Sequence, residues 1–393
     1  MKRILIFSLA YYPSFVSGAE AAIKEITDRI STDEIEFHML TLLFDKAAPR
    51  EERIGSVTIH RLGFGGKYLS KILFVPLAAL QARRMTRTKP FDAMWAMMTY
   101  MLFPVVLARA LGVRAPHILT LQDGDPYEKV FGRWFIKPVL PLLNYGFRTA
   151  ARIQVISAYL GTWPSKRGYT GPIELIHNGA NPRDLKDQVR AEEIAQIHAK
   201  FGKKAGDIWL VNTARLVHQK GNDDTIRALQ ELPEQVKFLI VGGGPDEQLL
   251  KDVAQESGVT DRVLFAGPVD RSLVSAYRKA ADIFVGPSRS EGLGNAFLSA
   301  MASRLPVVTT QEGGLAEFVF DEGHNPDVPP TAWVVRKDCS PDIAAAVKDI
   351  LAHPEKVEKI TANARAMVVE KYDWDQVAQQ MKARVFDPTL NGQ

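Results

Sequence analysis

The feature that most constrains the fold is an alternation of strand and helix patterns that runs through the chain twice. Short runs of apolar and β-branched residues stand between helical stretches, which is the pattern of βαβ units in a parallel sheet. The expected strands cover residues 3–9, 36–43, 57–62, 93–98, 117–122, 152–157 and 173–179, and then residues 208–216, 236–244, 262–269, 281–288, 305–310 and 332–337. The predicted fold class is therefore α/β, with two Rossmann-like, doubly wound domains.

A polar stretch between the two halves, residues 179–207, breaks the alternation and places a domain boundary near residue 180. The length of 393 residues fits two domains, because a single hydrophobic core seldom grows beyond about 250–300 residues. We expect an N-terminal domain over residues 1–180 and a C-terminal domain over residues 181–374, with a C-terminal helix at 375–393 that packs back on the first domain. Ligands of such sheets bind beyond the carboxyl ends of the strands, so two facing domains would share a cleft.

Composition is typical of a soluble globular protein from a reducing compartment. Apolar residues make up 46% of the chain and charged residues 24%, which is ordinary for folded domains. Cys339 is the only cysteine, so neither an intramolecular disulfide nor a cysteine-based zinc site can form. The longest uncharged run, residues 93–108, is too short to span a bilayer, and residues 1–13 read as a first strand rather than a signal peptide. The expected location is the cytoplasm.

Charge is distributed unevenly around a formal net charge of +4. Residues 1–180 hold 23 Lys and Arg against 14 Asp and Glu, and the remaining residues hold 26 against 31. Between Glu52 and Asp92 there is no acid, and basic residues alternate with apolar ones. Such a stretch favours an anionic membrane or an acidic acceptor, although a solvated basic face would have the same sequence. Nucleic acid is not expected as a partner, because no recognised binding motif accompanies the charge.

Motifs of several common cofactors are absent from the sequence. Gly18 is the one glycine between the first strand and its helix, and Gly242–Gly244 run directly into Pro245, so neither place has the spacing of a dinucleotide-binding turn. The chain has no Walker loop, no Gly-x-Ser-x-Gly elbow and no two histidines at metal-ligand spacing. We therefore expect no protein-bound metal and no tightly bound cofactor.

Two loops of the second half carry groups that suit the diphosphate of a phosphorylated sugar. Arg215 and Lys220 share one loop before a helix, where arginine offers two parallel donors to phosphate oxygens and lysine adds a point charge. A later helix start is formed by Gly292, Leu293, Gly294 and Asn295. The unpaired N–H groups and the dipole of a helix start favour an anion, so we expect the diphosphate to be held from both sides.

Five stretches of the second half have a shared order and spacing: ARLVHQKG, FLIVGGGPDEQLL, VLFAGPV, ADIFVGPSRSEGLGNAFLSAMASRLPVVTT and GGLAEFV. In these stretches the chain resembles the retaining glycosyltransferases of the GT-B fold, in particular the large family 4, also described as glycosyl transferases group 1. Weaker similarity extends to SGAEAAIKEI, LIHNGAN and KYDWDQVAQQM, so nearly the full chain is covered. Each stretch alone is weak evidence, but five in register argue against chance.

The resemblance implies a donor site in the C-terminal domain. In the family, the acid at the position of Glu291 contacts a hydroxyl of the donor sugar, and Gly267 and Val269 lie in a donor-binding stretch. Glu291 could instead be a helix-start acid that interacts only with the dipole. At the position of Ser299 the family usually has a second Glu, which binds the nucleotide ribose. Ser299 either forms a weaker neutral hydrogen bond with the ribose, or it faces the helix interior.

The first half departs from the family in one loop. Family members commonly have a His followed by an Asp after the strand at 117–122, and this chain has Gln122 and Asp123 there. By resemblance these two side chains would orient hydroxyls near the scissile bond, while Asp123 could instead cap its loop. Gly18 would let the main chain approach the donor phosphates, or it would be a simple turn glycine.

The function implied by the resemblance is that of a retaining hexosyltransferase in cell-surface glycan or glycolipid synthesis. The leaving phosphate would help to take the acceptor proton, while Arg215, Lys220 and the helix-start amides would stabilise the departing diphosphate without a metal. A UDP-sugar is the default donor, since uridine is the commonest base in the family. The expected acceptor is a saccharide or lipid-linked molecule, with peripheral contact between the basic N-terminal domain and the inner face of the cell membrane.

Two other functions stay open. The departures at Gln122 and Ser299 also suit a nucleotide-sugar-binding protein with little or no transferase activity. A sugar-nucleotide epimerase on the same two-domain architecture is the other alternative, although the pattern of Arg215, Lys220 and Glu291 favours transfer.

Overall fold

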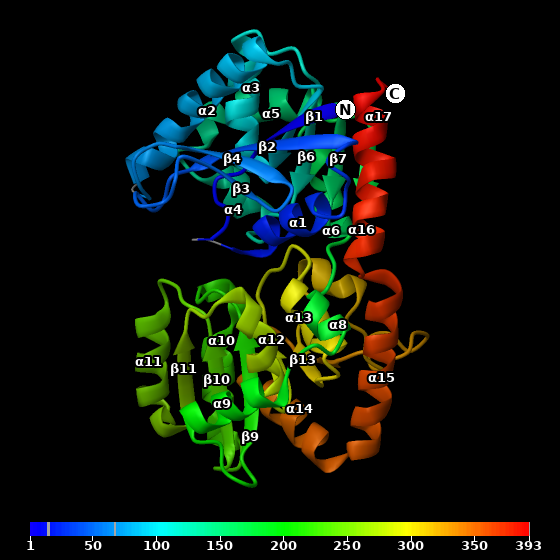
Figure 1. Cartoon of the computed structure of the whole chain (residues 1–393). Coiled ribbons are helices and arrows are strands. Elements are labelled where there is room, and N and C mark those ends of the chain that lie inside the picture. The colour runs from blue at the N-terminus through cyan, green and yellow to red at the C-terminus, as the bar shows by residue number, and fades with distance from the viewer. Residues whose placement is uncertain (14–15, 67, 393) are drawn as a thin grey trace. The chain divides into compact units, whose positions relative to one another are not determined.

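The computed structural model describes residues 1–13, 16–66 and 68–392. The chain divides into two compact units, of which unit 1 comprises Met1–Asn178 with Trp374–Gln393 and unit 2 comprises Gly179–Asp373. Each unit is built on one sheet with helices on both faces (Figure 1). The prediction of two doubly wound α/β domains is therefore confirmed.

The sheet of unit 1 has the strand order β3-β4-β2-β1-β5-β6-β7-β8. Its strands are β1 (Lys2–Phe7), β2 (Ile35–Leu42), β3 (Glu51–Ile54), β4 (Val57–Leu62), β5 (Ala93–Met97), β6 (His117–Leu121), β7 (Arg152–Val155) and β8 (Ile173–Leu175). All neighbours pair in parallel except β3 and β4, which are antiparallel. The sequence did not predict β3, because EERI has charged residues at three of four positions and lies at the exposed edge.

Helices cover both faces of this sheet. They are α1 (Gly18–Thr27), α2 (Tyr68–Thr88), α3 (Leu102–Ala110), α4 (Tyr127–Gly132), α5 (Leu140–Arg148), α6 (Ala158–Gly161), α7 (Trp163–Lys166), α16 (Trp374–Gln380) and α17 (Asp387–Leu390). One core contains side chains of the sheet, of α1 and of the C-terminal segment, where Phe386 contacts Phe37 and Trp95. The opposite face is covered by α2, α3 and α5, and α3 packs against both of the others.

Unit 2 has the strand order β11-β10-β9-β12-β13-β14, with every pair parallel. Its strands are β9 (Ile208–Thr213), β10 (Val236–Val241), β11 (Val263–Gly267), β12 (Ile283–Gly286), β13 (Val307–Thr309) and β14 (Trp333–Val334). The order reverses between β9 and β12, and doubly wound sheets bind ligands beside such a reversal. The loops that follow these two strands are therefore neighbours at the carboxyl edge of the sheet.

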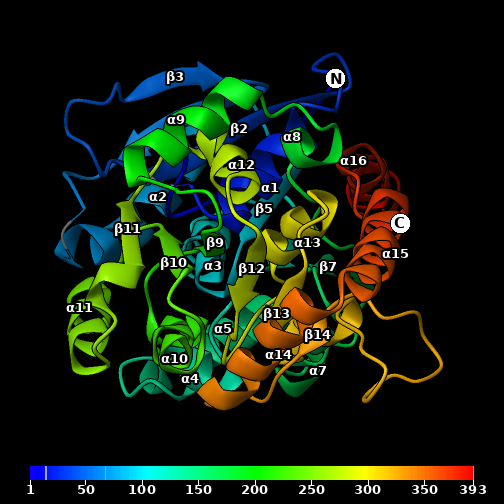
Figure 2. The same ribbon diagram turned by 90° about the horizontal axis from the view of Figure 1, so that it is seen from below.

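The helices of unit 2 lie on both faces of its sheet, as Figure 2 shows. They are α8 (Pro182–Leu185), α9 (Ala191–Phe201), α10 (Asn222–Ala228), α11 (Glu247–Glu256), α12 (Arg271–Lys279), α13 (Asn295–Ala302), α14 (Ser340–Ala352) and α15 (Pro354–Lys371). One core lies between the sheet and α10, α11 and α14. On the other face α12 packs against α9 and β9, and α13 packs against α8.

The short helix α8 is fastened to unit 2 by a buried carboxylate. Asp184 is fully buried, and its oxygens accept hydrogen bonds from Ser275 Oγ at 3.0 Å and Ser303 Oγ at 2.7 Å. The guanidinium of Arg278, which is also buried, forms an ion pair with the same carboxylate. Four side chains from α8, α12 and the end of α13 thus meet in one network of hydrogen bonds and an ion pair. The polar sequence around α8 did not predict this network.

Removal of the Asp184 carboxylate tests this network. Asp184→Ala leaves the buried Arg278 without a counter-charge, so the free energy of unfolding should fall by about 3–5 kcal/mol. Asp187→Ala is the matched control, because Asp187 also pairs with basic side chains, Lys279 and Arg365, but is about half exposed. The control should lose about 1 kcal/mol or less. Equal losses in chemical denaturation would show that burial of the pair does not matter.

Candidate functional site

In unit 2 the loops after β9 and β12 are joined by an ion pair. Lys220 Nζ lies 2.5 Å from Glu291 Oε1, and Ser288 Oγ donates a second hydrogen bond to the same oxygen at 3.0 Å. The Glu291 side chain is buried, whereas that of Lys220 keeps about a quarter of its surface exposed. The ammonium group therefore remains accessible to a ligand while the carboxylate holds it in place.

The backbone of the Lys220 loop lies directly against the loop after β12. Lys220 ends a 3₁₀ turn (His218–Lys220), and Gly221 follows with φ +64°. A Cβ at Gly221 would lie 2.2 Å from the carbonyl oxygen of Pro287, so only glycine allows this approach. Arg289 N–H also donates to Gln219 O at 2.7 Å. Main-chain contacts thus fix the position of Lys220 relative to Glu291.

The helix start after Glu291 has the geometry of an anion site. Gly294 precedes α13 in the left-handed region with φ 101°, and the first N–H groups of a helix have no partner within it. Gly292 and Leu293 are buried, whereas Gly294 and Asn295 are half-buried. The amides at the opening of α13 therefore lie on the same loop as Glu291, the residue that pairs with Lys220.

Three other expected donor-binding residues lie at the carboxyl ends of two strands of the same sheet, β9 and β11, which are separated by β10. Arg215 follows β9, is exposed, and forms no side-chain hydrogen bond or ion pair with the described residues. Gly267 ends β11 in the left-handed region with φ 70°, and Val269 follows two residues later, both half-buried. Because all these strands are parallel, their carboxyl ends lie along one edge. The structure places the three residues at that edge.

Ser299 has its hydroxyl engaged within unit 2. The Oγ atom donates to Asn295 O at 2.8 Å and accepts from Asn181 N–H at 3.0 Å, and the side chain is buried. The single donor of the hydroxyl and one of its two acceptor lone pairs are thereby used. Of the two alternatives for this residue, these contacts favour the one in which it faces the helix interior.

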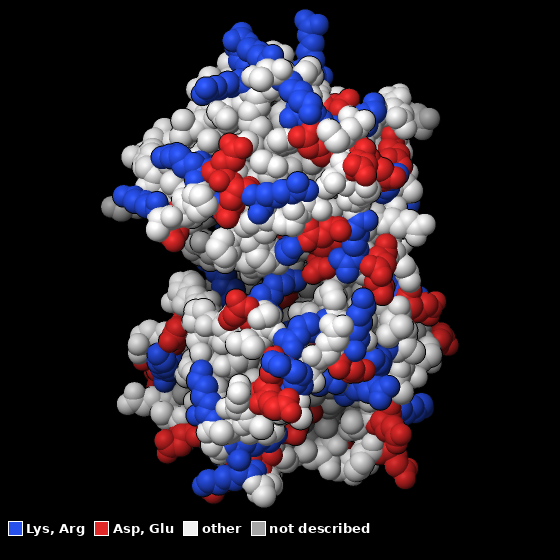
Figure 3. Space-filling view, in the orientation of Figure 1, with Lys and Arg blue, Asp and Glu red and all other residues white. Residues whose placement is uncertain are grey.

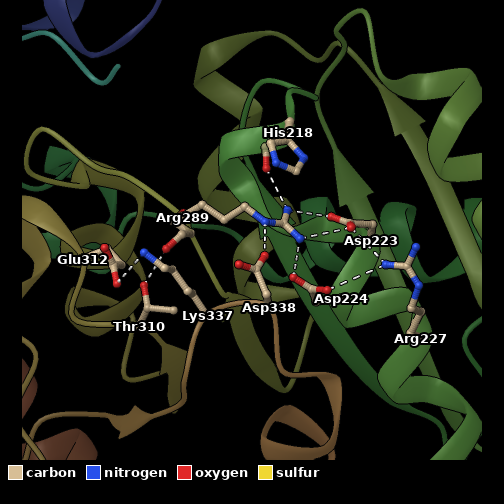
Figure 4. Close-up of polar contacts among 10 residues, drawn as sticks. His218, Asp223, Asp224, Arg227, Arg289, Thr310, Glu312, Lys337 and Asp338 are labelled. Atoms are coloured by element: carbon tan, nitrogen blue, oxygen red, sulfur yellow. Dashed lines mark hydrogen bonds and ion pairs between the residues drawn. The ribbon is translucent and has the colours of Figure 1, made fainter. Parts of the chain in front are cut away.

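Arg289 occupies the centre of a charged network beside this site (Figure 4). Its guanidinium donates to Asp223, Asp224 and Asp338 at 2.5–3.1 Å and to the carbonyl oxygen of His218 at 2.8 Å. Burial disfavours the charge, but the bonds to Asp223 and Asp338 outweigh it and raise the pKa of Arg289. The network connects the loop after β12 with the start of α10 and with the turn that carries Lys220.

In unit 1 Asp123 is fully buried at the end of β6. Its Oδ2 accepts hydrogen bonds from Thr99 Oγ1 at 2.9 Å and Thr99 N–H at 3.3 Å. Burial raises the pKa of Asp123 to about 6, while the two Thr99 bonds act in the opposite direction. A carboxyl group with this pKa exchanges its proton near neutral pH, which a catalytic acid or base requires.

Gln122 and Gly18 complete the expected residues of unit 1. The Gln122 amide is paired with the buried Asn178, whose Nδ2 donates to Gln122 Oε1 at 2.9 Å. Gly18 is exposed and begins α1, where the side chain of Glu20 accepts from Ser17 N–H at 2.7 Å. Gln122 therefore has a fixed orientation, and the main chain at Gly18 is open to solvent.

Four residues that position the side chains of the candidate site were not among the residues expected from the sequence. Ser288 and Arg289 precede Glu291 by three and two residues, Thr99 holds Asp123, and Asn178 holds Gln122. Ser288, Arg289 and Asn178 lie in stretches that resemble the family, which was the available signal. No sequence signal pointed to Thr99, because it follows a different strand and meets Asp123 only through the pairing of β5 with β6.

Two family models match the chain. Residues 17–179 match the description "Glycosyl transferase 4-like domain", and residues 193–367 match "Glycosyl transferases group 1". A GDP-mannose-dependent alpha-(1-6)-phosphatidylinositol monomannoside mannosyltransferase of Mycobacterium tuberculosis is 33% identical over 58% of this chain and 59% of its own length. In a second curated relative, the part that matches this chain is 52% of that relative's length. The chain therefore spans little more than half the length of these curated relatives.

Solved structures match nearly the whole chain. A sucrose-phosphate synthase from Thermosynechococcus elongatus has a TM-score of 0.85 at 20% identity and full coverage of both chains. The Anabaena protein HepE in complex with UDP-glucose has a TM-score of 0.77 at 20% identity, covering 98% of this chain and all of that one. The fold is thus that of the GT-B glycosyltransferases. Together with the two family models, it shows that the chain belongs to the group 1 glycosyltransferases.

The described residues contain neither a helix suited to span a membrane nor a cluster of metal ligands. Within residues 1–13, 16–66 and 68–392, no helix combines the length and apolar character needed to cross a bilayer. Over the same residues, no three His, Cys, Asp or Glu side chains are grouped closely enough to bind a metal ion.

The network around Arg289 can be tested by comparison with its neighbour Arg227. Arg289→Ala removes the shared partner of three acids, so we expect a loss of about 3–5 kcal/mol in the free energy of unfolding. Arg227→Ala is the control, since Arg227 pairs with Asp223 and Asp224 but is largely exposed, and it should cost about 1 kcal/mol or less. Arg289→Lys keeps the charge without the planar fork, and an intermediate loss is expected. Indistinguishable denaturation curves for the two alanine variants would contradict the role of Arg289.

The raised pKa of Asp123 predicts a pH-dependent stability difference. Folding favours the neutral carboxyl group, so its contribution is present at low pH and is lost as the pH rises through about 6. Asp123→Asn stays neutral at every pH. The melting temperature of the variant should therefore rise relative to wild type between about pH 4 and pH 7. Asp33→Asn, at an exposed acid of the same unit, should have no such trend, and a pH-independent difference for Asp123→Asn would exclude the raised pKa.

Proposed function

We propose that the chain is a nucleotide-sugar-dependent glycosyltransferase that moves a hexose to an acceptor hydroxyl with retention of anomeric configuration. The observation that carries the proposal is the Lys220–Glu291 ion pair beside the opening of α13. The ion pair joins the loop after β9 to the loop that leads into α13, at the point where the strand order reverses. Family membership supports glycosyl transfer as the reaction class.

The donor would bind to unit 2 at the carboxyl edge of its sheet. Lys220, Arg215 and the first amides of α13 would compensate the charge that grows on the departing diphosphate. Glu291 would accept a hydrogen bond from a donor hydroxyl. Gly267 and Val269 would line the same edge, while Ser299 would support the helix start through its two internal bonds.

Unit 1 would supply the acceptor side. Gln122 and Asp123 would orient the acceptor hydroxyl. The leaving phosphate would take the acceptor proton in a front-face reaction. The acceptor would be a saccharide or a lipid-linked molecule, in agreement with the basic character of residues 53–91.

The base of the donor is proposed as uridine, with guanosine as the alternative. HepE, whose fold matches, was crystallised with UDP-glucose, whereas the mycobacterial relative is named as GDP-mannose-dependent. A binding protein without transferase activity is a second candidate function. It is favoured by the Gln122 amide, which is already bonded to Asn178 and lacks the proton-transfer ability of a histidine.

A thermal-shift comparison of UDP, GDP, ADP and their sugars tests the donor site. At about 100 times its dissociation constant, the correct nucleotide should stabilise the protein by about 2.7 kcal/mol. Lys220→Ala removes a charged hydrogen bond and should weaken that nucleotide by about 10- to 100-fold. Lys237→Ala is the matched control, because Lys237 forms a similar ion pair with Asp207 at the amino end of β10. A Lys220→Ala variant with unchanged affinity would refute the site.

Transfer itself needs a separate measurement. Wild-type protein with the donor found above and a mixture of saccharide and lipid-linked acceptors should yield a product heavier by one hexose in mass spectrometry. Nuclear magnetic resonance of the new linkage should give the same anomeric configuration as in the donor. Tight donor binding without any product would favour the binding protein instead.

A further inference from the structure

Unit 1 presents a row of exposed apolar side chains along α5 and the turn before it. We call this row the α5 surface, and it comprises Trp134, Phe135, Val139, Leu142 and Tyr145. Trp134 is 81% exposed, and the other four are 39–46% exposed. Val139, Leu142 and Tyr145 follow one another at intervals of three residues, so they lie on one face of the helix. Large exposed apolar patches on soluble domains mark sites of interaction.

The exposed aromatic residues are held outward by buried neighbours. Phe131 and Ile136, on either side of Trp134 and Phe135, are both buried. The rings of Trp134 and Phe135 contact each other edge to face, with centroids 5.8 Å apart. On α5 itself Leu143 and other residues of the opposite face are buried. The two rings therefore protrude from a well-packed base.

The α5 surface belongs to a strongly basic part of the sequence. From Arg53 to Ile173 the chain contains 17 Lys and Arg but only four Asp and Glu, and no acid occurs between Glu128 and Glu174. Of the four acids, Asp123 is buried, and Asp125 is paired with Lys129 and Arg133. A third acid, Asp92, forms an ion pair with Lys2. An acidic protein partner could meet this charge, but a bilayer of anionic lipids meets both the charge and the protruding apolar rings.

Helix α2 continues the same character on the same side of the sheet. Leu69, Ile72 and Leu80 form an exposed apolar stripe, and Arg84 and Arg87 extend it toward the end of the helix. Because α3 packs against both α2 and α5, these two helices belong to one layer. In the view of Figure 3, the surface of unit 1 above α2 is mainly white and blue, and acidic side chains lie below it.

The direction of the helices places the apolar ends near the proposed acceptor site. Helices that connect parallel strands run opposite to them, so α2 and α5 begin at the carboxyl edge of the sheet. Gln122 and Asp123 follow β6 at the same edge. Trp134 and Leu69 thus lie at the edge of the sheet where an acceptor would bind, and the arginines of α2 lie at the opposite edge.

We propose that the layer of α2, α3 and α5 docks on an anionic lipid bilayer, with Trp134 and Phe135 inserted among the headgroups. Aromatic side chains are favoured at this depth, and each nearby Lys or Arg adds attraction to an anionic surface. The inference rests on the proposed function in one respect, which is that the acceptor is lipid-linked. The docking requires no donor and no catalysis.

Tryptophan fluorescence gives a direct test, because Trp134 is the exposed one among six tryptophans, all within the described residues. An aqueous quencher should quench Trp134 in the free full chain. Vesicles of phosphatidylcholine with about a third phosphatidylglycerol should protect it, whereas pure phosphatidylcholine should not, and salt raised from about 0.1 M to about 1 M should reduce the protection. Trp134→Phe should lose the quenchable signal but keep vesicle binding in sedimentation.

Substitution of the two rings tests insertion. Trp134→Ser with Phe135→Ser should lower the vesicle partition coefficient by about 10-fold or more. Leu249→Ser with Leu273→Ser is the matched control, since both leucines are exposed on unit 2, and its partition should equal that of wild type. Unchanged partition of the ring variant would overturn the proposal. Protection of Trp134 by raised protein concentration alone, with a dimer in light scattering, would also overturn it in favour of a second copy of the chain.

Nucleotide binding separates this proposal from the function of the site. The ring variant should have the same thermal shift with the donor nucleotide as wild type, because its substitutions lie in unit 1 and outside the donor loops. A protein that binds vesicles but no nucleotide would refute the donor site and leave the docking surface standing. A protein that binds nucleotide but no anionic vesicle would refute the docking surface alone.

Discussion

Parallel pairing is the constraint on which both units depend. Every ladder of the two sheets is parallel except the one between β3 and β4 at an edge. A parallel sheet must be covered on both faces by the helices that connect its strands, so its strands are almost entirely apolar. The same connections bring all carboxyl ends to one edge. Loops that are distant in sequence, such as those at Lys220 and Glu291, therefore become neighbours through strand order, and the ion pair between them forms across that contact.

Unit 2 buries charge only where partners surround it. The carboxylates of Asp184 and Glu291 each accept hydrogen bonds from serine as well as from a cation. A buried ion without a partner is very costly, so these groups must form their contacts during folding. At Glu291 this requirement also fixes the position of Lys220. Arg289, which is bonded to three acids and to the Lys220 turn, fixes it from the other side.

The sequence was sufficient for the fold but only partly for the site. Apolar runs locate the strands well, because a strand that is buried on both faces has few other compositions available. The edge strand β3 was missed because charged residues suit an edge. Motif residues such as Lys220 and Glu291 could be found from their loops, whereas the partner of Asp123 could not. Thr99 reaches that carboxylate only because β5 and β6 are adjacent, which is a property of strand order and not of local sequence.

Ser299 illustrates how a departure from a family pattern becomes part of the fold. A hydroxyl can donate and accept at once, and here it donates to the first residue of α13 and accepts from Asn181 at the entrance to unit 2. An ionised carboxylate at this position could accept but not donate, so it could not form both bonds. The serine thus stabilises the opening of α13, whose amides are the proposed anion site. Recognition of the donor would then depend more on the main chain of that helix and less on a second acid.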